Sequence, residues 1–165
     1  KISTAIVVGA FSGFFYIEDM DRAAGIKVVS STTVAVGDEV SVIGILNSAD
    51  GERVVTAPAL GVVVIGVGHI VRPIGMNGRS FASTSGLSNI GLLTSIWGKV
   101  GVVDPSGSFF YLDDGSSIGI KVLVPPGVSA PASGRYVICT GCAGMTPGPV
   151  AVLRCRTGAD IVIVE

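Results

Sequence analysis

Aromatic and lysine side chains recur at matching spacing in two parts of the chain, and together they could bind a flat ligand. The first platform is Phe14, Tyr16 and Lys27, and the second platform is Phe109, Tyr111 and Lys121. Because side chains alternate between the two faces of a strand, the platform aromatics share an outer face and the apolar residues between them face the core. Rings beside a lysine can stack sugars or bases. We therefore expect two outward-facing binding platforms.

The charge balance disfavours nucleic acid as the ligand. The chain has 11 basic and 12 acidic residues, for a net charge of -1, whereas affinity for phosphates comes mostly from uncompensated lysine and arginine. Glu18 and Asp113 are expected on the platforms, where each is a cross-strand partner for the lysine. A neutral glycan remains a candidate ligand. The same rings could equally lie in an interface or under a folded connector.

Other polar motifs predict no active site. Residues 115–119 match the GxSxG string, but they lie between two expected strands and not between a strand and a helix. The acidic residues at 18–21 and 113–114 are typical of turns, and no calcium-binding loop follows them. His69 is the only histidine and has no relay partner nearby. We therefore predict no enzyme, no catalytic residue, no metal and no cofactor.

Three cysteines, Cys139, Cys142 and Cys155, lie in the last third of the chain. The CxxC spacing of the first two lacks the second pair of a zinc site and the strand–helix setting of a redox motif. A hairpin near residues 147–149 brings Cys155 back opposite the first two cysteines. The sequence thus predicts a disulfide from Cys155, with Cys142 preferred as its partner, and an oxidising compartment. Three buried thiols acting as small apolar residues are the alternative.

The elements that must position these residues are themselves duplicated. The segment FFYIED followed by GIKV recurs as FFYLDD followed by GIKV, which indicates two copies of one supersecondary unit. Valine, isoleucine, glycine and proline abound, and no segment has helical apolar spacing. We predict an all-β protein of two tandem five-stranded modules. Their bounds are 1–66 for the first module, 67–91 for a connector containing Gly, Ser and Pro, and 92–165 for the second module.

The opening strands of the two modules differ in their apparent length. Residues 92–97 read as an additional first half of the second opening strand, if Lys1 is the counterpart of Lys99. The first module would then lack half a strand, either because the chain was cut from a longer precursor or because another copy supplies the edge. A short strand covered by the connector is the alternative. The start at Lys1 has neither an initiator Met nor a signal-peptide pattern, which indicates a mature or excised chain.

Composition indicates surface that is buried between chains. Only 14% of the residues are charged, 48% are hydrophobic and the mean hydropathy is +0.71, whereas a soluble surface usually has roughly a quarter to a third charged residues. Some apolar surface is therefore expected at an interface. The longest apolar stretch, residues 57–71, contains Pro58 and is shorter than the ~20 residues of a membrane span. We predict no membrane span.

The order of these motifs resembles the oligonucleotide/oligosaccharide-binding (OB) barrel modules found in tandem in large secreted bacterial surface proteins. The resemblance covers both modules through the strand led by Gly-Lys, the FFYIED and GIKV segments and VGDEVSVIG, and it includes the connector's PIGM, GLL and WGK segments. It implies OB-like barrels and an extracellular or cell-surface location, with the platforms where OB folds usually hold ligands. It transfers no catalytic residue, and OB barrels host many tasks.

Two functions follow from these patterns. The first is a non-enzymatic structural subunit that associates head to tail with copies of itself into a surface fibre or layer. The expected assembly residues are Ile2, Ala5, Ile6, Val7, Val8, Val63, Ile65, Ile70, Met76, Phe81 and Leu87. The alternative is a binding module that uses the two platforms for a glycan or single-stranded nucleic acid.

Overall fold

The computed structural model describes residues 1–82, 88–148 and 150–164 and confirms an all-β protein. It contains two seven-stranded sheets, one in each module. The first sheet consists of β1 (Ile2–Phe11), β2 (Phe14–Glu18), β3 (Gly25–Val29), β4 (Glu39–Val42), β5 (Ile45–Ala49), β6 (Glu52–Thr56) and β7 (Val62–Gly66). The second consists of β8 (Ile74–Gly75), β9 (Leu93–Val103), β10 (Phe109–Asp113), β11 (Ile120–Leu123), β12 (Tyr136–Thr146), β13 (Val150–Arg154) and β14 (Ile161–Ile163).

Five strands of the second sheet pair in a ring. The order runs from β9 to β10, β11, β13 and β12, and β12 pairs with β9 again. The β11–β13 pairing is parallel and the other four are antiparallel. Strand β8 lies along β9, and β14 lies along β12. The prediction of five strands per module therefore describes this ring and omits the two additional strands.

The first sheet has the same strand order, but its fourth strand is broken. Strands β4 and β5 take the place of the continuous β12, with order β5-β6-β3-β2-β1-β4-β7. Strands β5 and β7 are the two ends of this order. Among the described residues, β5 pairs only with β6 and β7 pairs only with β4, so the outer edge of each is unpaired. Two open strand edges therefore belong to the first module.

The two opening strands have nearly the same length. Strand β1 has ten residues and β9 has eleven. Ile6 of β1 lies opposite Glu18, and Lys99 of β9 lies opposite the equivalent Asp113. Ile6, and not Lys1, is therefore the counterpart of Lys99. The register behind the predicted missing half-strand is wrong, because cross-strand partners and not a shared lysine define the register. A smaller difference remains: Leu93 and Thr94 of β9 pair with Cys142 and Gly141, whereas, within the described chain, no residue of β1 pairs with the counterparts Ile45 and Gly44.

Each sheet encloses its own apolar core, as the alternation of side chains predicts. Phe15 and Ile17 lie in the first core, and Phe110 and Leu112 lie in the second. The connector contributes to the second core through the short helix α1 (Gly78–Phe81). Two further one-turn helices, η1 (Ala59–Gly61) and η2 (Gly158–Asp160), follow β6 and β13.

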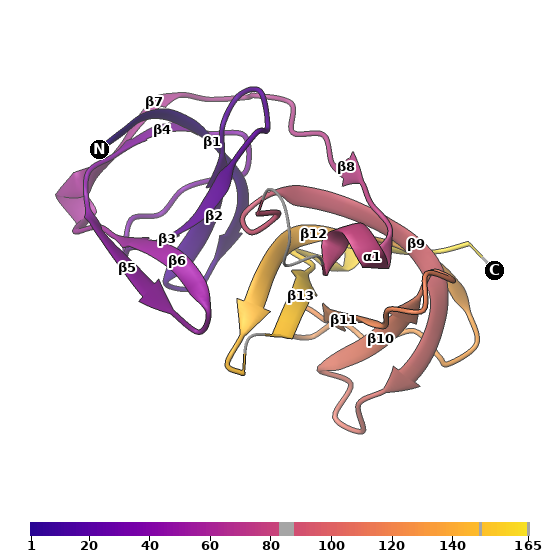
Figure 1. The fold of residues 1–165 in the computed structure, drawn as a ribbon. Helices are drawn as coiled ribbons and strands as arrows, with labels where there is room; N and C mark the ends of the chain where they lie inside the picture. Colours follow the sequence, from indigo (N-terminus) through magenta and orange to yellow (C-terminus); the bar gives the residue numbers. More distant parts are fainter. Residues whose placement is uncertain (83–87, 149, 165) are drawn as a thin grey trace.

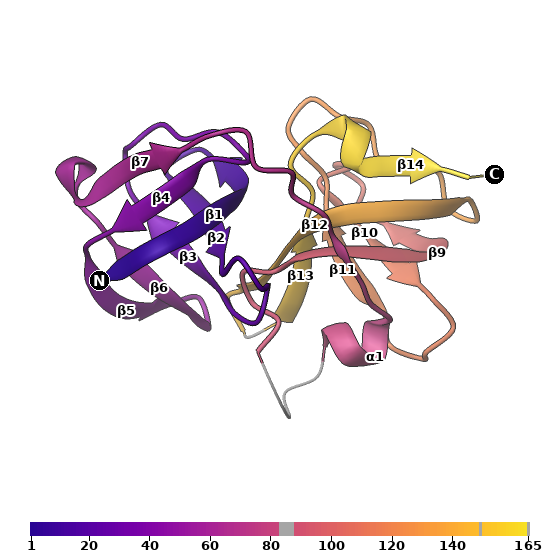
Figure 2. The ribbon, with the colours of Figure 1, turned by 90° about the horizontal axis from the view of Figure 1, so that it is seen from above.

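The modules lie side by side, and the chain ends are at opposite ends of the molecule (Figures 1 and 2). In both views β13 lies next to the first module. A third apolar cluster joins the two modules, with Val8 and Tyr16 from the first and Leu93 and Cys142 from the second. This contact is called the joint below. Among the described residues, no helix has the length and apolar character needed to cross a membrane.

Candidate functional site: two copies of an aromatic platform

The two predicted platforms have the same internal geometry. In the first platform the two rings lie 5.9 Å apart with their planes at 90°, and the lysine Nζ is 4.4 Å from the centre of the Phe14 ring. In the second platform the rings are again 5.9 Å apart at 90°, and the lysine Nζ is 4.0 Å from the centre of the Phe109 ring. Strand register causes this agreement, because in each copy the tyrosine lies directly opposite the lysine.

Only the second platform faces solvent. Tyr16 is 0% exposed, because Leu93 and Cys142 of the second module pack against it at the joint, and Lys27 is 8% exposed. The equivalent Tyr111 is 38% exposed. A ligand therefore cannot stack on Tyr16 while the modules are docked, and of the two predicted binding platforms only the second is accessible.

A buried carboxylate ties the joint together. Glu52 is 1% exposed, and its two carboxylate oxygens accept the Tyr16 hydroxyl at 2.9 and 3.0 Å. The backbone N–H of Met145, from the second module, also donates to Glu52. Lys27 Nζ lies 3.7 Å and Arg154 Nη2 lies 4.0 Å from the same carboxylate. Burial and the charge of Glu52 raise the pKa of Tyr16, so its hydroxyl remains a donor.

This network corrects the expected pairing of the platform lysines. Lys27 pairs with Glu52 and not with Glu18. Asp113 accepts the N–H of Gly115 within its own turn. Within the part of the chain that the structure describes, no ion pair joins Lys121 to a carboxylate. The second platform therefore presents an exposed ring beside an uncompensated ammonium group.

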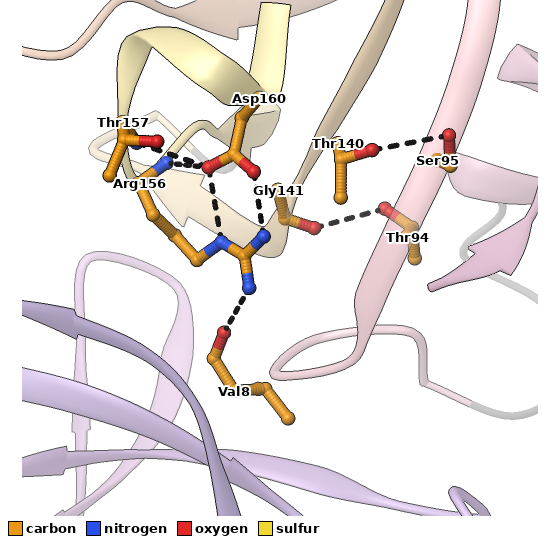
Figure 3. A network of polar contacts seen from close by, with 8 residues as sticks. All are labelled: Val8, Thr94, Ser95, Thr140, Gly141, Arg156, Thr157 and Asp160. Carbon is orange, nitrogen blue, oxygen red and sulfur yellow. Dashed lines mark hydrogen bonds and ion pairs between the residues drawn. The ribbon is translucent and has the colours of Figure 1, made fainter. Parts of the chain in front are cut away.

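Arg156 makes a second polar link across the joint (Figure 3). Its Nη1 donates to the backbone oxygen of Val8 at 3.0 Å. Asp160 holds the guanidinium through bonds of 3.0 Å to Nε and 2.6 Å to Nη2. Burial by itself would raise the pKa of Asp160, but the hydrogen bonds from the Arg156 side chain and backbone outweigh it and lower the pKa. The ion pair is thus kept charged and aimed at the first module.

Glu18 is buried at the joint and accepts the Leu93 N–H at 3.1 Å. Burial raises its pKa above 4.5, and the Leu93 bond and the charge of Arg22 only partly oppose this. Since the folded state then binds the proton more tightly than the unfolded state, this group's contribution to stability is fully present below pH 4.5 and is lost as pH rises through the folded pKa.

The variant Glu18→Gln, which keeps an oxygen acceptor without the charge, is expected to be more stable than the wild type at neutral pH. This advantage is expected to shrink as the pH falls through the raised pKa. Denaturant unfolding of both proteins from neutral to acidic pH measures the difference. Asp113→Asn, at the exposed counterpart, is the control. A difference for Glu18→Gln that is the same at every pH would contradict the expectation.

Several joint residues were missed by the sequence analysis. A Cβ at Gly25 would lie 2.5 Å from the backbone carbon of Gly91, and one at Gly144 would lie 2.6 Å from the Tyr16 hydroxyl. The lack of side chains therefore permits the modules to approach. The one available signal for Glu52 was a carboxylate at the start of the strand segment ERVVT.

The structure separates Cys142 from Cys155, the preferred pair of the predicted disulfide. Cys139, Cys142 and Cys155 are free thiols and all three are buried, as in the alternative interpretation. Cys142 lies opposite Arg154 and packs into the joint, whereas Cys155 is the next residue and packs with Cys139 in the second core. Because neighbouring residues of a strand face opposite sides, Cys142 and Cys155 point away from each other.

The predicted assembly residues fall into two groups. The buried group is packed within the chain, where it cannot contact another copy, and that part of the prediction is wrong; it consists of Ala5, Ile6, Val7, Val8 and Phe81. Val63, Ile65 and Ile70 are exposed, Ile2 and Met76 are half-buried, and Leu87 lies outside the described residues. Further exposed apolar side chains of the first module are Met20, Val36, Ile43, Ile45, Leu46, Leu60 and Val64.

Comparisons with known proteins add no family. No protein-family model matches the chain, and no curated protein matches it. Among the described residues, no three His, Cys, Asp or Glu side chains come together as possible metal ligands. The joint, the second platform and the exposed apolar strands are therefore the features on which a function can be based.

Proposed function

We propose that this chain is a non-enzymatic, extracellular structural subunit that assembles with copies of itself into a surface fibre or layer. The observation that carries the proposal is the apolar surface of the first module, where Ile45 is 71% and Leu60 is 97% exposed. Every residue of β5 and the middle three of β7 are exposed, and both strands belong to the first module (Figure 1). Monomeric soluble proteins rarely leave large contiguous apolar patches uncovered.

The open edges of the first sheet support the same proposal. Strands β5 and β7 are the ends of the strand order, and their sequences, ILNSA and VVVIG, contain no charge and no proline. Proteins that avoid edge pairing usually place lysine, proline or a bulge on such strands. These edges have no charge or proline to prevent pairing and are therefore suited to contact another copy.

We further infer that each module is an OB-like barrel. The ring of five paired strands in the second module and the same strand order in the first support this architecture. The extracellular location rests on the resemblance to tandem modules of secreted bacterial surface proteins. The free cysteines lend it no support.

The assembly can be tested with sedimentation velocity and electron microscopy over a concentration series. The average mass is expected to grow with concentration without reaching a limit, because the contacts do not close. Ammonium sulfate is expected to increase the mass, since it strengthens apolar burial, whereas contacts made by exposed charges weaken with salt. A constant monomer mass at every concentration, with or without sulfate, would overturn the proposal.

A binding module is the second candidate function, and the exposed second platform favours it. Tyr111 is accessible, and Lys121 has no ion-pair partner in the described residues. The same sedimentation series, repeated with an added neutral oligosaccharide or a dT oligonucleotide, separates the two functions. A monomer that binds one of these probes supports the binding module, and polymers that form without either probe support the structural subunit.

A further inference from the structure

We propose that the second platform is the receptor for the β5–β6 hairpin of another copy of this chain. The hairpin docks there as the β12–β13 hairpin docks on the first platform within each chain. This inference rests on the proposed self-assembly and names the two surfaces that meet. Its basis is the internal duplication, because the chain contains two matching platforms and two matching hairpins. One platform and one hairpin are already in contact at the joint. Of the other two, the second platform has the exposed Tyr111, and the β5–β6 hairpin has β5 and Thr56 exposed, whereas Glu52 and Val54 of β6 are buried at or beside the joint.

Strand register identifies the matching positions of the two hairpins. The parallel pairings of β3–β6 and β11–β13 make Thr56 the counterpart of Arg154. Ile45 lies opposite Thr56 and Cys142 lies opposite Arg154, so Ile45 is the counterpart of Cys142. Cys142 is buried in the joint, whereas Ile45 is exposed. The apolar position that the joint uses therefore occurs a second time without cover.

The charges of the two contacts match in the same way. At the joint, Glu52 of the platform side lies 4.0 Å from Arg154 of the hairpin. At the second contact the counterparts are Val150 and Thr56, which are both uncharged and exposed. Since both members of the ion pair are absent together, docking buries no unpaired charge at this point.

Polar groups of the hairpin match the remaining groups of the second platform. Asn47 stands where Gly144 stands and can offer its amide to the Tyr111 hydroxyl, in place of the carboxylate that Tyr16 uses. Ser48 is the counterpart of Met145. At the joint the backbone N–H of Met145 donates to Glu52, the carboxylate that pairs with Lys27. The exposed Asp50 lies two residues further along the hairpin, and we expect it to pair with Lys121 in the docked arrangement.

The fold leaves room for this contact. In the ring of the second module, the β12–β13 hairpin and the β10–β11 pair are two of five steps apart. A copy docked on β10–β11 therefore lies almost on the opposite side from the chain's own first module. The contact joins two different surfaces, so each chain retains one free platform and one free hairpin. Such contacts produce an open head-to-tail polymer.

The experiment uses two complementary variants of the full chain. Tyr111→Asp disables the platform and keeps the hairpin, whereas Ile45→Asp disables the hairpin and keeps the platform. Each variant by itself is expected to remain a monomer at concentrations where the wild type polymerises. An equimolar mixture is expected to form a dimer and nothing larger, because one intact platform meets one intact hairpin. Circular dichroism and thermal unfolding check that both variants are folded, which we expect since both positions are exposed.

Tyr136→Asp and Met20→Asp change exposed residues outside the proposed contact and are expected to polymerise like the wild type. Polymers of either disabled variant, or a mixture without dimers, would overturn this inference and leave the self-assembly proposal standing. A wild type that never associates would overturn both.

A charge exchange in the same mixture tests the register. Adding Lys121→Glu to the Ile45→Asp variant, which keeps the platform, is expected to weaken the dimer by up to about fivefold, the range of an exposed ion pair. Adding Asp50→Lys to the Tyr111→Asp variant, which keeps the hairpin, is expected to restore the affinity of the dimer. A second reversal that weakens the dimer further would overturn the assignment of this pair.

Discussion

Replacing Glu52 with leucine is expected to lower the free energy of unfolding by about 3–5 kcal/mol, the cost of breaking a buried ion pair. The carboxylate is 1% exposed and is the shared partner of Tyr16, Lys27 and Arg154. Without it, the buried Tyr16 hydroxyl loses its acceptor, and Lys27 and Arg154 lose their counter-charge, although Arg154 still donates to the Met145 backbone oxygen at 2.6 Å. Denaturant unfolding followed by circular dichroism measures the loss.

Two further variants separate the parts of this network. Tyr16→Phe removes one hydroxyl and leaves the cations paired, so about 1–2 kcal/mol is expected. Glu52→Leu combined with Arg154→Leu removes both charges and is expected to recover part of the loss. Stability equal to the wild type in Glu52→Leu would show that the network does not hold the joint.

Replacing Gly25 with valine is expected to force the modules apart. A Cβ at this position would lie 2.5 Å from the carbonyl carbon of Gly91, 2.8 Å from its oxygen and 2.8 Å from the Leu92 nitrogen. All three are backbone atoms, so no side-chain rotation can relieve the contact. We expect a loss of about 3 kcal/mol. Small-angle X-ray scattering is expected to show an increased radius of gyration, with both sheets retained by circular dichroism.

The duplication provides a matched control for this variant. Gly119 is the counterpart of Gly25, and a Cβ there would meet only the Tyr111 ring at 3.6 Å. Gly119→Val is therefore expected to change the stability by less than about 0.5 kcal/mol, as other surface substitutions do. Equal effects of the two variants, measured in dilute solution, would show that the backbone contact at the joint is not the cause.

The open form of Gly25→Val also links the joint to binding. Separation of the modules uncovers the first platform, whose geometry matches that of the second. The present accessibility of only one platform is thus a property of the docked arrangement and not of the residues.

The sequence by itself determined the features that depend on neighbouring residues. The alternation of apolar and polar side chains placed Phe15 and Ile17 in the core and Tyr16 on the outer face. The repeat predicted that Tyr111 and its platform would match the first copy, as they do. These inferences succeed because the direction of a side chain in a strand follows from its position in the strand.

Only the tertiary structure decided which platform stays exposed, because the two copies carry the same residue types. The burial of Tyr16 depends on contacts with Leu93 and Glu52, which are distant in the sequence. It also depends on the close approach of Gly25 to Gly91. The register of β1 and the separation of the cysteines likewise depend on cross-strand partners. Contacts between distant segments arise only when the whole chain is packed, so a local pattern cannot specify them.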